Sequence, residues 1–184
     1  MTSSKNAERN IDGTLFTFPS GWRVGEFDTW QQYRDVAGQW DVMGCDIVAF
    51  NGTSLWLIEV KDYTYPNVSP PQNLTDMIAL KAVGTMAVLF AQARSASDSE
   101  ASSFARACHS AQQIQLALHI NVRRDGRSEK QIKASFKSIH HRLRRAKQLL
   151  RLAGAFISSN QYSLTPVPWK ARRDPATRRE HTDQ

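Results

Sequence analysis

The chain has 184 residues, of which 41% are hydrophobic and 22% charged, and this composition suits one domain with a core of its own. Segment 1–13 has no apolar stretch that would act as a signal peptide, and the apolar-rich segment 77–93 is too short and too polar to span a bilayer. We therefore expect a soluble, cytoplasmic protein that meets no membrane. Neither cysteine has metal-ligand spacing around it, and we expect Cys45 to be buried and reduced.

The net charge of +7 is concentrated in one half of the chain. Residues 121–184 hold 16 Lys and Arg against 5 Asp and Glu, whereas residues 1–120 hold 8 against 12. A basic half joined to a half with clustered carboxylates is typical of a protein that holds a polyanion with one face and acts on it with another. A solvated basic surface without a ligand is the alternative interpretation.

The beginning of the chain predicts a flexible segment followed by short strands. We expect residues 1–13 to be flexible and residues 14–165 to form the folded domain. Within 14–27, a Pro-Ser-Gly turn separates two short apolar segments that are typical of strands. Residues 29–40 fit a helix and a loop equally well.

The next segment, 44–62, predicts a β-hairpin around the pair Asn51-Gly52. Asn and Gly readily adopt the positive φ that both central residues of a type I′ turn require, and β-branched, apolar residues flank the pair on both sides. If these two residues form the whole loop, Phe50 pairs with Thr53. The register of the rest of the hairpin follows from that pair.

In this register Asp46 lies opposite Leu57, with Glu59 on the diagonal. Because side chains alternate between the faces of a strand and paired residues share a face, we expect Asp46, Glu59 and Lys61 on one side of the hairpin. The other side is apolar and is expected to enter the core with Ile47, Ala49, Trp56, Ile58 and Val60. Two carboxylates and a lysine beside a core are costly unless they bind something.

After the hairpin, the chain alternates loops with regular elements. In order, we expect an irregular proline-rich loop at 65–73, a mostly buried helix at 75–94, a polar loop at 94–103, a short helical turn at 104–111, a half-buried strand at 114–122 and a strand near 155–158. His119 on the second strand is expected to be a hydrogen-bonded sheet residue rather than a metal ligand. Residues 166–184 are rich in proline and arginine, and we expect a poorly ordered basic tail.

The clearest helix spans 128–152. Ser128 and Gln131 form a capping-box pattern at its start, and its apolar residues recur at alternating spacings of three and four. The stripe expected to face the sheet is Ile132, Phe136, Ile139, Leu143 and Leu150. The row of cations expected to face solvent and to track a phosphate backbone is Lys130, Lys133, Lys137, Arg144 and Arg151. Lys81, on the earlier helix, could also reach a phosphate, although a solvated lysine is the simpler interpretation.

Asp46, followed by Glu59-x-Lys61 at the end of a buried strand, resembles the signature of the PD-(D/E)xK nuclease superfamily. The resemblance covers about residues 14–158, because the following helix and strand arrive in the order that this family uses. It implies the restriction-endonuclease-like fold, an α/β fold in which helices flank a central mixed sheet.

The resemblance also implies an activity, the metal-dependent endonucleolytic hydrolysis of phosphodiester bonds, with DNA favoured over RNA. Asp46 and Glu59, with the backbone carbonyl of Val60, would hold Mg²⁺, for which Mn²⁺ can substitute, since hard oxygen ligands suit this ion. Lys61 would orient or deprotonate the attacking water and contact the phosphate. Because one site cuts one strand, a second copy or a partner subunit is expected for a double-strand cut.

Two positions depart from the family pattern. Cys45 stands where many members have a proline before the first carboxylate. The acidic residue that an N-terminal helix often supplies has no clear counterpart, and Glu26 and Asp28 are the nearest.

Two alternatives stay open. A non-catalytic nucleic-acid-binding or scaffold subunit of a defence or repair complex could have the same fold. Glu59 and Lys61 could also form a surface ion pair at a strand end, with Asp46 capping a turn. Restriction, phage defence, repair and recombination are all compatible with a nuclease of this kind.

Overall fold

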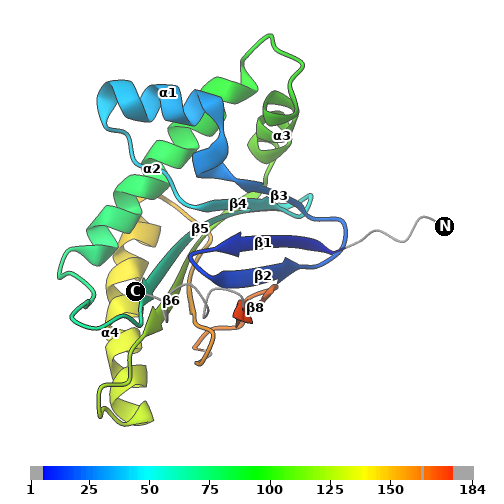
Figure 1. The fold of residues 1–184 in the computed structure, drawn as a ribbon. Helices are drawn as coiled ribbons and strands as arrows, with labels where there is room; N and C mark the ends of the chain where they lie inside the picture. The colour runs from blue at the N-terminus through cyan, green and yellow to red at the C-terminus, as the bar shows by residue number, and fades with distance from the viewer. Residues whose placement is uncertain (1–5, 163, 176–184) are drawn as a thin grey trace.

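The computed structural model describes residues 6–162 and 164–175, which form a mixed α/β fold with two β-sheets and four α-helices (Figure 1). The strands are β1 (Ala7–Ile11), β2 (Thr14–Phe18), β3 (Arg23–Glu26), β4 (Ile47–Phe50), β5 (Ser54–Tyr63), β6 (Gln113–Val122), β7 (Gly154–Ser158) and β8 (Lys170–Arg173). The helices are α1 (Gln31–Trp40), α2 (Leu74–Ala93), α3 (Glu100–His109) and α4 (Glu129–Leu149), with a short 3-10 helix η1 (Phe27–Thr29).

The larger sheet is mixed, as the sequence predicted, and has the strand order β3-β4-β5-β6-β7. β3, β4 and β5 pair antiparallel, whereas β5, β6 and β7 pair parallel. The four helices cover one face of this sheet (Figure 1). The other face is covered by the small antiparallel sheet β1-β2-β8 instead of by helices, because Phe16, Phe18 and Trp169 pack their rings against Ile58 and its neighbours.

Strand β6 is buried on both faces, so the expectation of a half-buried strand is wrong. Leu116, Leu118 and Ile120 enter the core beneath the helices. His119 and Asn121 point to the other face, where the small sheet buries them, and each finds hydrogen-bond partners there. The alternation of apolar and polar residues along β6 therefore separates two buried environments rather than core and solvent.

His119 is satisfied by hydrogen bonds, as expected. Its Nδ1 lies 3.0 Å from Ser158 Oγ and its Nε2 lies 3.1 Å from Asn160 Oδ1. Phe16 meets the imidazole edge-on, with ring centroids 4.9 Å apart. These contacts give His119 a structural role on the face of the sheet that the small sheet covers.

We predict that His119 makes the free energy of unfolding fall in acid. Burial lowers the pKa of His119 from 6.5 to about 4, and the Asn160 hydrogen bond and the Asp62 charge oppose this only in part. The unfolded chain takes up a proton below pH 6.5 while the folded protein does not, so stability is complete above that pH and is lost as pH falls towards 4, by roughly 3 kcal/mol. Urea unfolding across this range should show a smaller loss for His119→Gln than for the wild type. Parallel pH profiles for the two proteins would show that another group carries the dependence.

Both ends of the described chain contain strands that the sequence did not predict. β1 lies within the segment 1–13 that was expected to be flexible, and β8 lies within the expected basic tail 166–184. Both strands pair with β2, which supplies the hydrogen-bonding edges and the apolar side chains that order them. Residues 1–5 and 176–184 lie outside the described part of the chain.

Helix α2 is apolar on almost every side. Among the described helices it alone is long and apolar enough to cross a membrane by length and composition, with 44% of the tested window buried. Ile78, Ala82 and Val88 enter the core beneath the helices, so α2 packs as the core helix of a soluble protein does. Leu80 and Phe90 remain exposed, so the helix is less completely buried than expected.

The remaining helices largely follow the sequence. α4 begins with the predicted capping box between Ser128 and Gln131 and buries its apolar stripe, with Leu150 only partly buried. It ends at Leu149, before the expected boundary, and Arg151 adopts a left-handed φ of 56° just beyond it. α1 resolves the ambiguity at 29–40 in favour of a helix, and α3 is longer than the helical turn expected at 104–111.

Candidate active site

The hairpin that carries the predicted site has a longer loop than expected. Phe50 pairs with Leu55, not with Thr53. The Asn51 side-chain oxygen accepts hydrogen bonds from the amides of Thr53 and Ser54, at 3.0 and 2.7 Å. In this Asx-type turn the Asn51 side chain accepts the hydrogen bonds of the loop amides, so the two-residue turn that Asn-Gly favours is not formed.

The true register differs from the predicted one by an even number of residues, so every side chain stays on its predicted face. Ile47 pairs with Ile58, and continuing this ladder by one residue places Asp46 opposite Glu59 rather than on its diagonal. A one-residue shift would have separated the two carboxylates, because side chains alternate with a period of two. The predicted convergence therefore holds and is closer than expected.

The structure brings four charged side chains together. Glu59 is fully buried, and its Oε1 lies 2.6 Å from Lys61 Nζ and 2.6 Å from Lys81 Nζ. Lys81 Nζ also lies 3.9 Å from Asp46 Oδ1, so one ammonium contacts both carboxylates. The Val60 amide donates a hydrogen bond of 2.6 Å to Asp46 Oδ2. We call Asp46, Glu59, Lys61 and Lys81 the carboxylate–lysine cluster.

Three elements position this cluster. Glu59 and Lys61 project from central strand β5 towards the helices, and Asp46 sits just before β4, where its carbonyl accepts a hydrogen bond of 2.9 Å from the Phe27 amide. Lys81 comes from α2. At Gly84, one turn further along, a Cβ would lie 2.0 Å from the Met43 carbonyl oxygen, so glycine allows α2 to approach the segment that leads to Asp46.

The cluster perturbs the acidity of its members. Burial and the neighbouring Glu59 charge raise the pKa of Asp46 from 3.8 to about 7, against the Val60 hydrogen bond and the two lysines. For Lys61, burial favours the neutral amine, but the charge and hydrogen bond of Glu59 outweigh it and raise the pKa. Two carboxylates that cannot easily both be charged indicate a site where a further positive charge is stabilising.

The donor set fits a divalent cation with hard oxygen ligands. Glu59 Oε2 is buried and finds no hydrogen-bond partner within the described chain, whereas Oε1 meets both lysines. A buried, unpartnered carboxylate oxygen is costly and is the group that a metal ion would satisfy. In the described ranges no group of three or more His, Cys, Asp and Glu side chains could hold a metal. The protein side chains would thus supply two carboxylates, which suits Mg²⁺ because it keeps several waters and binds substrate phosphate.

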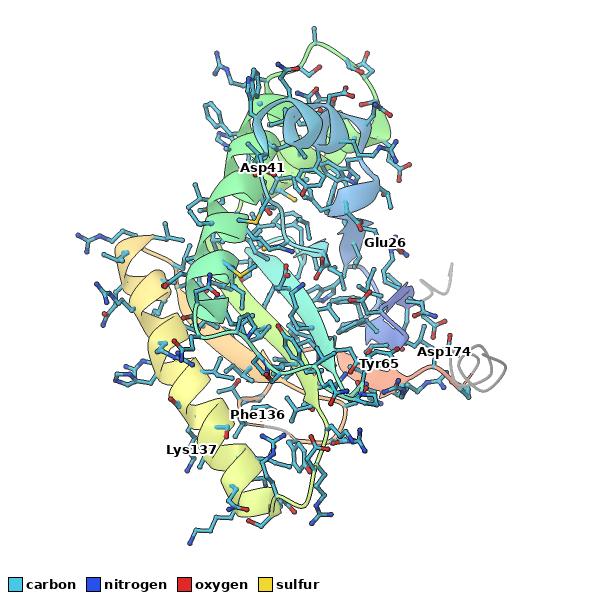
Figure 2. The ribbon with its side chains drawn as sticks, turned by 60° about the vertical axis from the view of Figure 1, so that its left-hand side comes forward. Glu26, Asp41, Tyr65, Phe136, Lys137 and Asp174 are labelled. Atoms are coloured by element: carbon cyan, nitrogen blue, oxygen red, sulfur yellow. The ribbon has the colours of Figure 1, made fainter. Side chains whose placement is uncertain are left out.

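The structure does not bring the other predicted residues to the cluster. Glu26 ends β3 and forms an ion pair of 3.6 Å with Arg9, and Asp28 is exposed in η1. The cations of α4 lie elsewhere, and Figure 2 shows Lys137 on the outer side of α4, on the opposite side of the helix from Phe136. Lys133 forms an ion pair of 2.5 Å with Glu129 on the same helix. These cations remain a predicted nucleic-acid surface rather than part of the site.

Lys81 is the member that the sequence interpretation undervalued. We took a solvated lysine as the simpler interpretation, but only 17% of its side chain is exposed. A signal was available, because Lys81 lies four residues after Met77 and three after Ile78, the spacing that places side chains on one face of a helix. A lysine on the buried face of a helix requires an anionic partner.

Comparisons with known proteins give little. No protein-family model and no solved structure matches the chain. Among curated proteins, the chain is similar to the cysteine--tRNA ligase of Neisseria meningitidis serogroup A, at 25% identity over 139 residues. The match covers 58% of this chain and 20% of the ligase, so the chain spans about a fifth of the length of that relative. A likeness this partial shows no family.

Proposed function

We propose that this protein is a cytoplasmic, Mg²⁺-dependent endonuclease that hydrolyses phosphodiester bonds in DNA. The observation that carries the proposal is the Glu59 carboxylate, which is fully buried, opposed by Asp46 and approached by two lysines, with one oxygen unpartnered. A structural ion pair explains one contact of Glu59 but not the second carboxylate or the unpartnered oxygen. A site for a cation and a phosphate explains all of them.

The fold belongs to the same proposal. An antiparallel β3-β4-β5 unit leads through α2 into the parallel β5-β6-β7 pairing, which is the arrangement expected for a restriction-endonuclease-like domain. Asp46 comes just before β4, and Glu59 and Lys61 lie in the second half of β5, as the PD-(D/E)xK resemblance implies. The small sheet β1-β2-β8 would be an addition to that core.

Asp46 and Glu59, with the carbonyl of Val60, would hold the Mg²⁺, and Mn²⁺ would substitute. Bound there, the ion would neutralise charge on the phosphate and acidify a water. The Val60 amide keeps the Asp46 carboxylate pointed across the hairpin towards Glu59. Because Glu59 Oε2 has no hydrogen-bond partner among the described residues, this oxygen would be available to the ion.

The lysines supply positive charge at fixed positions. The raised pKa of Lys61 favours the ammonium, which stabilises the charge that builds on the phosphate in the transition state. A cation held by Glu59 would weaken that effect and favour the neutral amine, which can take a proton from the attacking water. Lys81 approaches from the opposite element, α2, so the two lysines can contact different oxygens of one phosphate.

A cleavage assay tests the proposal directly. Purified protein incubated with supercoiled plasmid, single-stranded DNA and RNA should cut DNA in Mg²⁺ or Mn²⁺, and excess EDTA should stop the reaction. The products also report the number of strands cut, and a concentration-dependent double-strand cut would indicate a second copy in the active assembly. Failure to cut any of the three with either ion would favour the non-catalytic nucleic-acid-binding subunit.

A further inference from the structure

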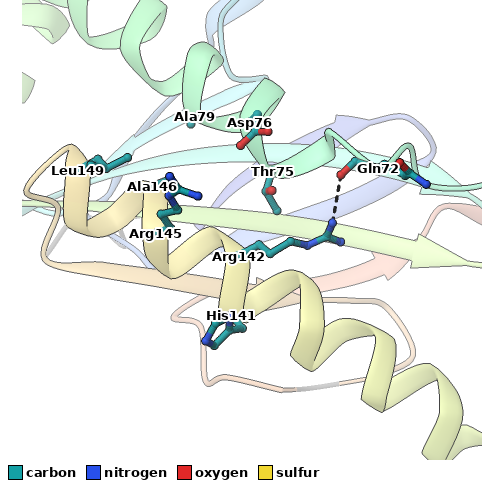
Figure 3. Close-up of a pocket in the computed structure, with 9 residues that line it drawn as sticks. All are labelled: Gln72, Thr75, Asp76, Ala79, His141, Arg142, Arg145, Ala146 and Leu149. Atoms are coloured by element: carbon teal, nitrogen blue, oxygen red, sulfur yellow. Dashed lines mark hydrogen bonds between the residues drawn. The ribbon is translucent and has the colours of Figure 1, made fainter.

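A groove of about 560 Å³ lies between α2 and α4, apart from the carboxylate–lysine cluster (Figure 3). Its charged and polar lining comes from the start of α2, with Thr75 and Asp76, and from one side of α4, with His141, Arg142 and Arg145. Its apolar lining is Ala79, Ala146 and Leu149. The groove is therefore amphipathic and lies on a different side of α4 from the predicted row of cations.

Two guanidinium groups in this groove have donors to spare. Arg142 Nη1 donates a hydrogen bond of 3.1 Å to the carbonyl of Gln72 and has four other N–H groups (Figure 3). Arg145 has no hydrogen bond or ion pair with any other residue that the structure describes. Asp76 places one carboxylate at the rim, so the groove carries two permanent positive charges against one negative charge.

The lining of the groove includes a hydroxyl that can bind a ligand. Thr75 is 5% exposed, lines the groove, and its hydroxyl has no hydrogen-bond partner within residues 6–162 and 164–175. Thr75 is also in the first turn of α2, and Asn73 at the N-cap makes no side-chain capping bond. The amides of Leu74, Asp76 and Met77 already donate to backbone carbonyls, so it is the positive end of the helix dipole that favours an anion at this point. The Thr75 hydroxyl is not among the described polar atoms that are sealed from solvent without a partner, so it can donate a hydrogen bond to a ligand in the groove.

We propose that this groove binds a phosphate group of the nucleic-acid strand, next to the phosphate that is cut. Thr75 and Lys81 lie six residues apart on α2, about 9 Å along the helix axis, and this is the span of a few nucleotides. The loop that leads from Lys61 to α2 also contains Gln72, which anchors Arg142. The groove would thus fix the strand on the same helix that presents Lys81. This inference rests on the proposed nuclease function for its substrate but on separate residues for its binding.

A nucleic-acid backbone suits the groove better than an acidic peptide. Arginine forks match the paired oxygens of a phosphate, and the start of α2 adds the positive end of a helix dipole. The apolar lining, with Leu149 73% exposed, offers a surface for the sugar and base that flank a phosphate. The basic second half of the chain also attracts a polyanion over a long range.

Two matched double variants on α4 test the groove. Arg142→Gln with Arg145→Gln removes two charges from the groove, whereas Lys137→Gln with Arg144→Gln removes two charges from the exposed outer row of the same helix. Fluorescence anisotropy of a short labelled DNA duplex, in EDTA to prevent cleavage, measures the affinity. We expect the groove double to bind about tenfold or more weakly and to lower the slope of log K against log salt by about one to two. The outer-row double tests the predicted row of cations and should lose less affinity than the groove double.

Thr75→Val provides a test that does not alter charge. The substitution keeps the shape of the side chain and removes the unpartnered hydroxyl, so the melting temperature should stay unchanged or rise. DNA affinity should nevertheless fall several-fold. Equal affinity for Thr75→Val and wild type would show that the hydroxyl does not contact the ligand.

The outcomes separate this proposal from the nuclease proposal. Equal losses in both double variants, or a loss only in the outer row, would overturn the groove and support the predicted row of cations as the binding face. Wild-type protein that binds neither DNA nor RNA would also overturn it. Binding through the groove without cleavage in Mg²⁺ would keep the groove and remove the nuclease. Cleavage of DNA by the wild type, together with unchanged DNA affinity in the groove double variant, would keep the nuclease and remove the groove.

Discussion

Asp46→Asn should lower the rate of Mg²⁺-dependent DNA cleavage by about 10²-fold or more while leaving the fold intact. The asparagine has the shape of the protonated carboxyl and can still accept the Val60 hydrogen bond. Because burial and Glu59 already raise the pKa of Asp46 to about 7, the folded protein tolerates an uncharged side chain here. The metal site does not, since it would lose one of the two carboxylates that the side chains supply.

The control for this variant is Asp28→Asn. Asp28 is exposed in η1 and is one of the two N-terminal acidic residues that the family resemblance suggested. Its replacement should leave the single-turnover cleavage rate unchanged, and thermal unfolding should match the wild type for both variants. A wild-type rate in Asp46→Asn would remove Asp46 from the site. A loss in Asp28→Asn as large as in Asp46→Asn would place Asp28 in it.

The hairpin shows which part of a site can be predicted from sequence. The loop and the register were wrong, since Asn51 uses its side chain to close a longer turn. The face of each side chain was right, because the error in register was an even number of residues. Alternation assigns the faces within one strand, but Asp46 and Glu59 share a face across the two strands only if the register is wrong by an even number of residues. The convergence of Asp46, Glu59 and Lys61 therefore did not need the exact register.

Contacts between distant segments were harder to predict. β1 and β8 have weak strand patterns of their own and are ordered by β2, which lies far from β8 in the sequence. β6 looked half-buried because its polar residues, such as His119, alternate with apolar ones, yet the small sheet covers them. The pattern of residues within β6 does not show that a second sheet covers the strand. For the same reason, Lys81 was recognised as a possible phosphate contact but not as the partner of Glu59.

Lys61→Met and Lys81→Met should each lower the cleavage rate by about 10²-fold, the scale of removing one group that stabilises transition-state charge. Methionine keeps much of the apolar length of lysine and removes only the ammonium. Each lysine lies 2.6 Å from the same Glu59 oxygen, so either variant leaves this buried carboxylate with one charged partner. Because the two lysines share that partner, the double variant should lose less than the product of the two single losses.

The two lysines can be distinguished by measuring rate and stability together. If a lysine contacts the phosphate, its replacement by methionine should lower the single-turnover rate at saturating DNA. Replacement by arginine at the same position should retain part of that rate, because it keeps the charge. If a lysine only neutralises Glu59, its replacement by methionine should lower the melting temperature and leave that rate unchanged. Lys137→Met, on the exposed outer side of α4, is the matched control and should alter neither quantity. If Lys81→Met cuts as fast as the wild type while Lys61→Met does not, Lys81 serves the buried carboxylate, and the chemistry belongs to the hairpin alone.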